Sequence, residues 1–283
     1  MAYKPSPRPT FDRPTHISYS CVTRYLWGDD TSGKVDDWIY VSSGKIHQLV
    51  FGLPPGGAFR HSAEFRTVFG ADELLFVLEG LYISANPETG EVHVAKEGEA
   101  IFFRKDTWHH GFNGGTRPVR VLEFFAPPPS TGASGAYART RPYVETSRYT
   151  RDDWLGRFPM EARQLSSANT MQVMRDSDIV WRLEGARQQS LVGLYCATEH
   201  LTVGRVRLLP GQCSDIESHG GDEGLYLLSG SLNILAPETE GQSWFELHPK
   251  DGFYLPAGAH HQYHNVGAEP VEFLFGIAPK YLP

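Results

Sequence analysis

The sequence has few cysteines, no long apolar run and no basic tract. Its three cysteines, Cys21, Cys196 and Cys213, are far apart, which excludes a disulfide framework or a cysteine metal knuckle and suits a reducing compartment. No run of about 18 apolar residues occurs, and no apolar segment follows the N-terminal charges, so we expect a cytoplasmic protein that does not insert into membranes. With 26 basic against 33 acidic residues, the chain offers no electrostatic surface for nucleic acid or an anionic membrane.

What the sequence does contain is typical of a strand-rich globular protein. Its 283 residues are 40% hydrophobic and 21% charged, and 29 glycines and 20 prolines punctuate short runs rich in valine, isoleucine, phenylalanine and tyrosine. These runs predict strands at 45–53, 73–78, 81–85, 92–95, 100–103 and 119–125, and again at 202–208, 224–228, 232–236, 244–247, 253–255 and 271–278. The spacing predicts an all-β protein built of sandwiches or small barrels, with only a few short helices.

The distribution of prolines and glycines divides the chain into four parts. Residues 1–35 are proline-rich and polar, which predicts an N-terminal extension. A segment of prolines, serines and glycines begins at Pro127, and we expect a linker over 128–185. The two predicted barrels then occupy 36–127 and 186–283.

The two predicted barrels repeat one another. The segment from Glu73 to Gly80 matches the segment from Glu223 to Gly230, with conserved spacing of the apolar residues, at an offset of 150. His109 and Asn113 likewise match His261 and Asn265 at an offset of 152, and the small drift is accounted for by one loop insertion. A repeat of this length indicates two copies of one fold.

The second half carries two motifs by which the chain resembles the cupin superfamily. Gly211, five residues, Glu217-Ser-His219, three residues, Glu223, six residues and Gly230 fit the family's first motif, except that Glu217 replaces a histidine. Pro256-Ala-Gly258, two residues, His261, three residues and Asn265 fit the second motif, with Lys250 in place of its leading glycine. The repeat resembles the bicupins, and the resemblance implies two tandem double-stranded β-helix barrels.

The resemblance implies a metal centre in the second barrel. Residues two apart on a strand share a face, so Glu217 and His219 point the same way. Glu223 alternates with Leu225 and Leu227, so it faces inward on the next strand, and His261 approaches from a later one. Two imidazoles and two carboxylates suit one divalent ion per chain, Fe(II) or Mn(II) first, while Zn(II) and Ni(II) remain alternatives. Glu217 and Glu223 are each candidates for a metal ligand and for a catalytic base.

The first barrel has fewer candidate ligands. Thr67 and Phe69 stand where the first motif has its two ligands, which leaves Glu73 and His109, with His61 as a candidate third member of a weaker second site. The alternative is a metal-free barrel in which Glu73 pairs with Arg60, Arg66 or Arg104. In that case the barrel would be a scaffold and a dimerisation partner, and we expect a homodimer or higher homo-oligomer.

Three residues near the two motifs of the second barrel are candidates for substrate binding. Arg205 and Arg207 lie in phase on the predicted strand 202–208, where they would clamp a carboxylate, or else form a solvated outer face. Tyr263 is a candidate for lining the pocket at the mouth of the barrel.

The family resemblance implies an enzyme that acts on a small polar metabolite. Non-heme dioxygenase chemistry is the first expectation, because a two-histidine carboxylate centre accommodates O₂ and a chelating substrate. The Glu217-x-His219 start also resembles ureidoglycine aminohydrolase, which implies manganese-assisted hydrolysis of a C–N bond; lyase and isomerase chemistry suit the same residues. A non-catalytic bicupin that binds a small molecule is the third alternative.

Overall fold

The protein consists almost entirely of antiparallel β-strands. The computed structural model describes residues 8–62, 67–127, 138–140, 144–152, 155–156 and 168–283. Over these residues the non-strand elements are limited to one short 3-10 turn, η1 (Tyr19–Cys21). Within the same residues no helix is long and apolar enough to span a membrane. The predicted all-β class is confirmed.

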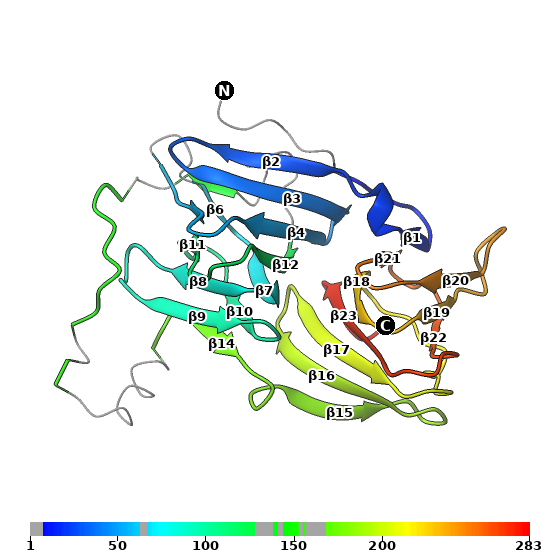
Figure 1. Ribbon diagram of the computed structural model, residues 1–283. Helices are drawn as coiled ribbons and strands as arrows, with labels where there is room; N and C mark the ends of the chain where they lie inside the picture. Colours follow the sequence, from blue (N-terminus) through cyan, green and yellow to red (C-terminus); the bar gives the residue numbers. More distant parts are fainter. Residues whose placement is uncertain (1–7, 63–66, 128–137, 141–143, 153–154, 157–167) are drawn as a thin grey trace.

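Two seven-stranded sheets, one from each half, form the centre of the molecule (Figure 1). The first has the order β14 (Met171–Met174), β10 (Ala100–Phe103), β7 (Asp72–Glu79), β12 (Val119–Ala126), β4 (His47–Leu53), β3 (Gly33–Ser42) and β2 (Arg24–Asp29). The second has the order β1 (Thr15–Ile17), β21 (Gly252–Leu255), β18 (Asp222–Ser229), β23 (Val271–Ala278), β17 (Thr202–Leu208), β16 (Ser190–Ala197) and β15 (Val180–Glu184). The two orders correspond strand for strand, which is the predicted repeat.

Smaller sheets close each half into a barrel. In the N-terminal half these are β5 (Ala58–Phe59), β11 (His110–Asn113), β8 (Leu81–Ala85) and β9 (Val92–Lys96), and the pair β13 (Ala138–Thr140) and β6 (Thr67–Phe69). In the C-terminal half they are β20 (Trp244–Leu247), β19 (Leu232–Leu235) and β22 (Gln262–His264). Each barrel has its own apolar cluster between its large and small sheets.

The outer faces of the two large sheets pack against each other. Strand alternation sends Leu225 into the C-terminal barrel and Tyr226 into a third apolar cluster, which contains residues of both halves. Two glycines make this close approach feasible: a Cβ at Gly224 would lie 2.4 Å from the Gln48 side chain, and one at Gly276 would lie 2.4 Å from the Phe124 ring. The halves therefore share one continuous core and form a single packed unit.

Each half also contributes an edge strand to the other half's large sheet. Strand β1 pairs with β21 of the C-terminal barrel, and β14 pairs with β10 of the N-terminal barrel. The segments predicted as an extension (1–35) and a linker (128–185) therefore contain strands of both sheets, including β2 and β15. The sequence did not indicate this because a three- or four-residue edge strand has little periodicity of its own.

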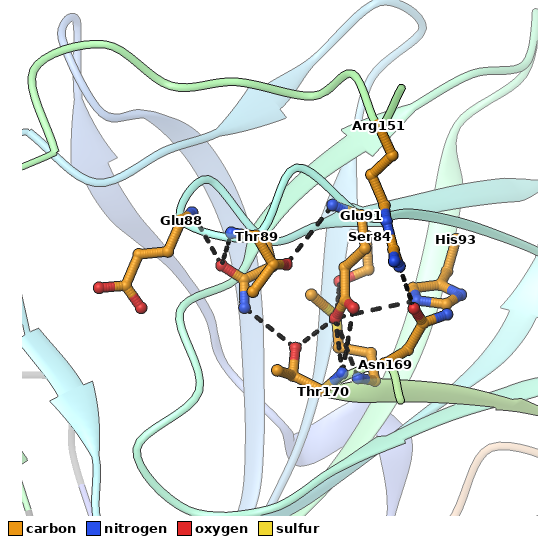
Figure 2. Close-up of polar contacts among 10 residues, drawn as sticks. Ser84, Glu88, Thr89, Glu91, His93, Arg151, Asn169 and Thr170 are labelled. Atoms are coloured by element: carbon orange, nitrogen blue, oxygen red, sulfur yellow. Dashed lines mark hydrogen bonds and ion pairs between the residues drawn. The ribbon is translucent and has the colours of Figure 1, made fainter. Parts of the chain in front are cut away.

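A buried carboxylate anchors the exchanged strand β14. Glu91, which is 2% exposed, accepts hydrogen bonds from the backbone N–H of Thr170 and Met171, and also from the Thr170 hydroxyl. Asn86 donates to the same hydroxyl over 3.0 Å, and Ser84 donates to the Met171 sulfur (Figure 2). These contacts fix the start of β14 against β8 and β9.

Two equivalent aspartates tie the halves together. Asp72 pairs with Arg104 at 3.0 Å and accepts a 2.7 Å hydrogen bond from Thr198 of the C-terminal half. Its counterpart Asp222 pairs with Lys45 of the N-terminal half at 2.8 Å. Both aspartates are buried and immediately precede the first interior glutamate of their barrel, so this reciprocal pair fixes the same strand end in both halves.

We expect Asp72→Asn to lower the free energy of unfolding by about 1.5–3 kcal/mol, because the amide loses the charge opposite Arg104 and an acceptor for Thr198. Urea unfolding of the metal-free protein measures this. Asp176→Asn is the control, since Asp176 is exposed and its ion pair with Arg205 is on the surface. Equal effects of the two substitutions would contradict the assigned role of Asp72.

Candidate metal centre

Three chain segments bring the motif residues of the C-terminal barrel together. Glu223 is the second residue of β18 and points into the barrel on the same face as the buried Leu225. The backbones of Glu217 and His261 form an isolated bridge, with two N–H···O hydrogen bonds of 2.9 Å. The Gly258 N–H donates to the His219 carbonyl over 2.7 Å. The two motifs are thus joined through their backbones.

His219, Glu223 and His261 form a compact group at the centre of this barrel. One ligand atom from each lies within 4.8 Å of the others, and the carboxylate Oε2 of Glu223 is 3.6 Å from the Nε2 atom of each histidine. The three residues are 8%, 2% and 0% exposed, respectively. Two imidazoles and one carboxylate at these separations form a set that suits a divalent transition metal.

Hydrogen bonds on the far side of each ring orient the two imidazoles. The Nδ1 atom of His219 donates to the Tyr281 carbonyl over 2.7 Å, and the Nδ1 atom of His261 donates to the Ala259 carbonyl over 3.1 Å. Both Nε2 atoms are therefore the deprotonated nitrogens and face Glu223. Burial lowers the pKa of His261 to about 3, which keeps this imidazole neutral. This is the arrangement in which histidines bind metal ions.

The inward-facing atoms of this group have no hydrogen-bond partners. The Nε2 atom of His261 and the Oε2 atom of Glu223 are both buried and unpartnered, whereas the Glu223 Oε1 atom accepts a 2.7 Å hydrogen bond from the Tyr263 hydroxyl. Burial raises the pKa of Glu223 to about 8. Because unpartnered buried polar atoms are costly, their convergence fits a cation that would satisfy both.

Glu217, the predicted fourth ligand, lies beside this group rather than within it. Its Oε1 atom is 3.9 Å from the His261 Nε2 atom, and its side chain is 28% exposed. Burial, followed by the nearby charge of Glu223, raises the pKa of Glu217 to about 7. A cation beside this carboxyl would favour its ionised form, in which it can accept a proton.

Two segments of the chain match the model of the cupin domain, residues 49–125 and 204–277. Together they make up more than half of the sequence. The chain belongs to the cupin family. Because the domain occurs twice, the protein is a bicupin, and the predicted pair of tandem cupin barrels is confirmed.

Solved structures share the fold of this bicupin at low sequence identity. A putative glyoxylate-induced protein from Pseudomonas aeruginosa has a TM-score of 0.63 and 15% identity, covering 96% of this chain and 91% of its own. Bacillus subtilis oxalate decarboxylase has a TM-score of 0.58 and 16% identity, covering 98% and 80%. Escherichia coli YlbA has a TM-score of 0.62 and 12% identity, covering 94% and 90%. No curated protein matches the chain significantly.

A pocket open to solvent leads to His219 and Glu223, two of the three metal-binding candidates of the bicupin. Glu217 and the predicted Tyr263 line it as well. Tyr281, near the C-terminal end, forms part of its wall: its ring stacks on His219 at a centroid distance of 5.0 Å. Neither Tyr281 nor Glu184, which accepts a hydrogen bond from its hydroxyl, belongs to a recognisable motif, so neither was predicted.

Arg205 and Arg207 lie on the other face of β17 and do not line the pocket, which corrects their predicted role as a carboxylate clamp. The residue between them, Val206, lines the pocket, and alternation turns both neighbours away from it. Arg205 instead pairs with Asp176 at 2.8 Å and lies over the Trp181 ring. Arg207 is 3.6 Å from Glu272.

In the N-terminal barrel, His61, Glu73 and His109 do not form a comparable group. Among the described residues, the metal-binding geometry is met by the C-terminal trio alone. The His61 and His109 rings are 6.2 Å apart and perpendicular, and His61 packs edge-on against Trp108. The expected second site is therefore not assembled. Of the three arginines considered as partners of Glu73, Arg66 lies outside the described residues. Arg104 pairs with Asp72 instead, and Arg60 lies over the Phe112 ring.

Glu73 is hydrogen-bonded to a second interior carboxyl, Glu123. The two residues lie on the same face of the adjacent strands β7 and β12, where Glu73 is opposite Phe125. Burial raises the pKa of both, that of Glu123 to about 7, and Asp37 shows a raised pKa from burial and from the charge of Glu123. A hydrogen bond between two carboxyls requires a shared proton, so this barrel holds protons where the other holds metal-binding candidates.

We expect this acidic interior to lose stability as the pH rises. The folded-state pKa of Glu123 is about 7 against an ordinary value of 4.5, so its contribution is fully present below about pH 4.5 and is lost as the pH rises through 7. We compare the free energy of unfolding of Glu123→Gln with that of wild type at each pH. At about 1.4 kcal/mol per pKa unit, this difference should favour the variant by about 2 kcal/mol more at pH 8 than at pH 5.

Unfolding curves at both pH values, with the exposed Glu79→Gln as a control, measure this difference. Carboxyls away from Glu123 cancel in the comparison between variant and wild type, whereas Glu73 and Asp37, whose pKa values depend on Glu123, belong to the measured difference. Parallel stability curves for Glu123→Gln and wild type would contradict the shared proton.

Proposed function

We propose that this bicupin is a metal-dependent enzyme that uses one divalent cation in its C-terminal barrel to promote an acid–base reaction on a small metabolite. His219, Glu223 and His261 would hold the cation, and Glu217 would transfer the proton. The observation that carries the proposal is the convergence of buried, unpartnered Nε2 and Oε2 atoms with a second carboxyl, that of Glu217, beside them. Hydrolase, lyase and isomerase chemistry all belong to this class.

The roles of the residues follow from their surroundings. A bound divalent cation would supply Lewis-acid polarisation of a substrate oxygen. His219 and His261 are held in the required tautomer by carbonyls, and Tyr263 fixes the Glu223 carboxylate so that its free oxygen points to the same place. Glu217, which reaches the pocket, is positioned to accept or donate a proton at the substrate.

The donor set also supports a choice of metal. Nitrogen and oxygen ligands without sulfur favour Mn(II) or Fe(II) over softer ions. A B. subtilis oxalate decarboxylase of similar fold is described as having Mn(II) centres, which agrees with this preference. We therefore expect Mn(II) or Fe(II), at about one equivalent per chain.

Elemental analysis of the purified protein, before and after reconstitution with Mn(II) or Fe(II), tests the proposal. About one equivalent of metal per chain supports the proposal, and about two would indicate a second metal site in the N-terminal barrel. A protein that retains no metal after reconstitution, while remaining folded, would exclude metal-dependent catalysis.

Oxidation by O₂ is the second candidate. Two histidines and one carboxylate, with a pocket beside them, are typical of non-heme Fe(II) oxygenases. Oxygen uptake during turnover by the Fe(II)-loaded protein separates the two candidates, because an acid–base reaction proceeds equally well without O₂.

A further inference from the structure

The charged residues that line the pocket are all acidic. They are Glu184, Asp215, Glu217 and Glu223, and no lysine or arginine is among the described lining residues. Both arginines of β17 point away from the pocket, towards Asp176 and Glu272. An anionic group of a substrate would therefore find no cationic side chain in this pocket.

Contacts within the protein offset only part of this negative charge. Asp215 accepts hydrogen bonds from the backbone N–H of Ala186, Arg187 and Gln188. Glu184 is paired with Arg182 at 2.9 Å and also accepts a hydrogen bond from Tyr281. The two positive charges of a divalent cation would balance the negative charges of Glu217 and Glu223 at most. The loaded pocket would thus be neutral or negative, never positive.

One wall of the pocket is apolar. Val192, Val206, Phe275 and Ile277, from the neighbouring strands β16, β17 and β23, line it together. In the corresponding strands of the N-terminal barrel, acidic residues replace two of these apolar ones: Asp37 is the equivalent of Val192, and Glu123 is the equivalent of Phe275. The apolar wall is therefore a feature of the C-terminal barrel, and it would accommodate the hydrocarbon part of a ligand.

We propose, on the basis of the function proposed above, that the substrate is a small molecule with a hydrocarbon part and a neutral or positively charged polar group, and that the pocket discriminates against anions. The hydrocarbon part lies against Val192, Val206 and Phe275. Its amide, hydroxyl or ammonium group donates hydrogen bonds to the carboxylates at the pocket, among them Glu184. Glu223, whose Oε2 atom is buried and unpartnered, lines the same pocket.

Three probes of nearly identical shape test this inference. Isobutylamine, isobutyramide and isobutyrate share one hydrocarbon group and differ in charge, and calorimetric titration of the metal-loaded protein gives their dissociation constants. We expect the amine and the amide to bind at least about tenfold more tightly than the acid, which corresponds to repulsion between like charges of about 1.4 kcal/mol or more. The bound metal works against the expected order of affinities, because isobutyrate is the one probe of the three with a carboxylate that can ligate a metal.

Glu184→Gln should weaken binding of isobutylamine and strengthen binding of isobutyrate, while leaving that of isobutyramide unchanged. Glu246→Gln is the matched control, since Glu246 is exposed on β20 and does not line the pocket. Isobutyrate binding as tightly as the amine, or no binding of any probe, would overturn the inference. Metal content, measured on each sample, reports separately on the proposed function: a metal-loaded protein that prefers the acid contradicts only the substrate class.

Discussion

His261→Ala is expected to weaken metal binding by about a hundredfold or more, so that the purified variant retains little metal. His261 contributes one of three converging ligand atoms and has no other partner for its Nε2 atom. Elemental analysis and titration with Mn(II) measure the effect. The metal-free variant should remain folded, because loss of an unsatisfied buried nitrogen offsets part of the cost of the cavity and of the lost hydrogen bond to Ala259.

The repeat supplies a matched control for this experiment. His109 occupies the position of His261 in the N-terminal barrel, 152 residues earlier, and lies among aromatic rings, including Phe103 at 4.7 Å. His109→Ala should leave the metal content unchanged. If His109→Ala lost the metal and His261→Ala kept it, the centre would have been assigned to the wrong barrel.

Glu217→Gln is expected to reduce kcat by about 100- to 10,000-fold, the usual contribution of a general acid–base group, with the metal retained. The amide preserves the shape and the half-buried position of Glu217 but cannot carry a proton at neutral pH. Steady-state kinetics on the substrate, combined with elemental analysis of the same sample, measures both quantities.

The two readouts distinguish the two roles that the sequence left open for Glu217. Loss of metal together with activity would make this residue a ligand, contrary to its position outside the compact group. Unchanged kcat with full metal content would remove Glu217 from the mechanism altogether. Only a loss of turnover at constant metal content supports the proposed proton transfer.

Much of the site was predictable because it depends on local spacing. Glu223 was expected to face inward from its alternation with Leu225 and Leu227, and the two leucines are fully buried. His219 and His261 were expected to meet because the two motifs flank the same barrel. Spacing did not separate Glu217 from the ligand group, since that distinction depends on differences of about an ångström in side-chain placement.

Other features depend on contacts that the local pattern does not encode. The in-phase arginines Arg205 and Arg207 were correctly placed on one face of a strand, but their phase alone does not say which face is the interior. Tyr281 contacts His219 across 62 residues, and β1 packs next to a residue 235 positions away through His16 and Asp251. Partners at such separations follow from the assembled fold.

The reciprocal exchange of β1 and β14 also bears on why a metal-poor barrel persists in this chain. Cutting the protein between its halves would leave β21 and β10 as open sheet edges, each liable to associate with other chains. The N-terminal barrel therefore completes the sheet of its neighbour through β1, and this structural role does not require metal ligands of its own.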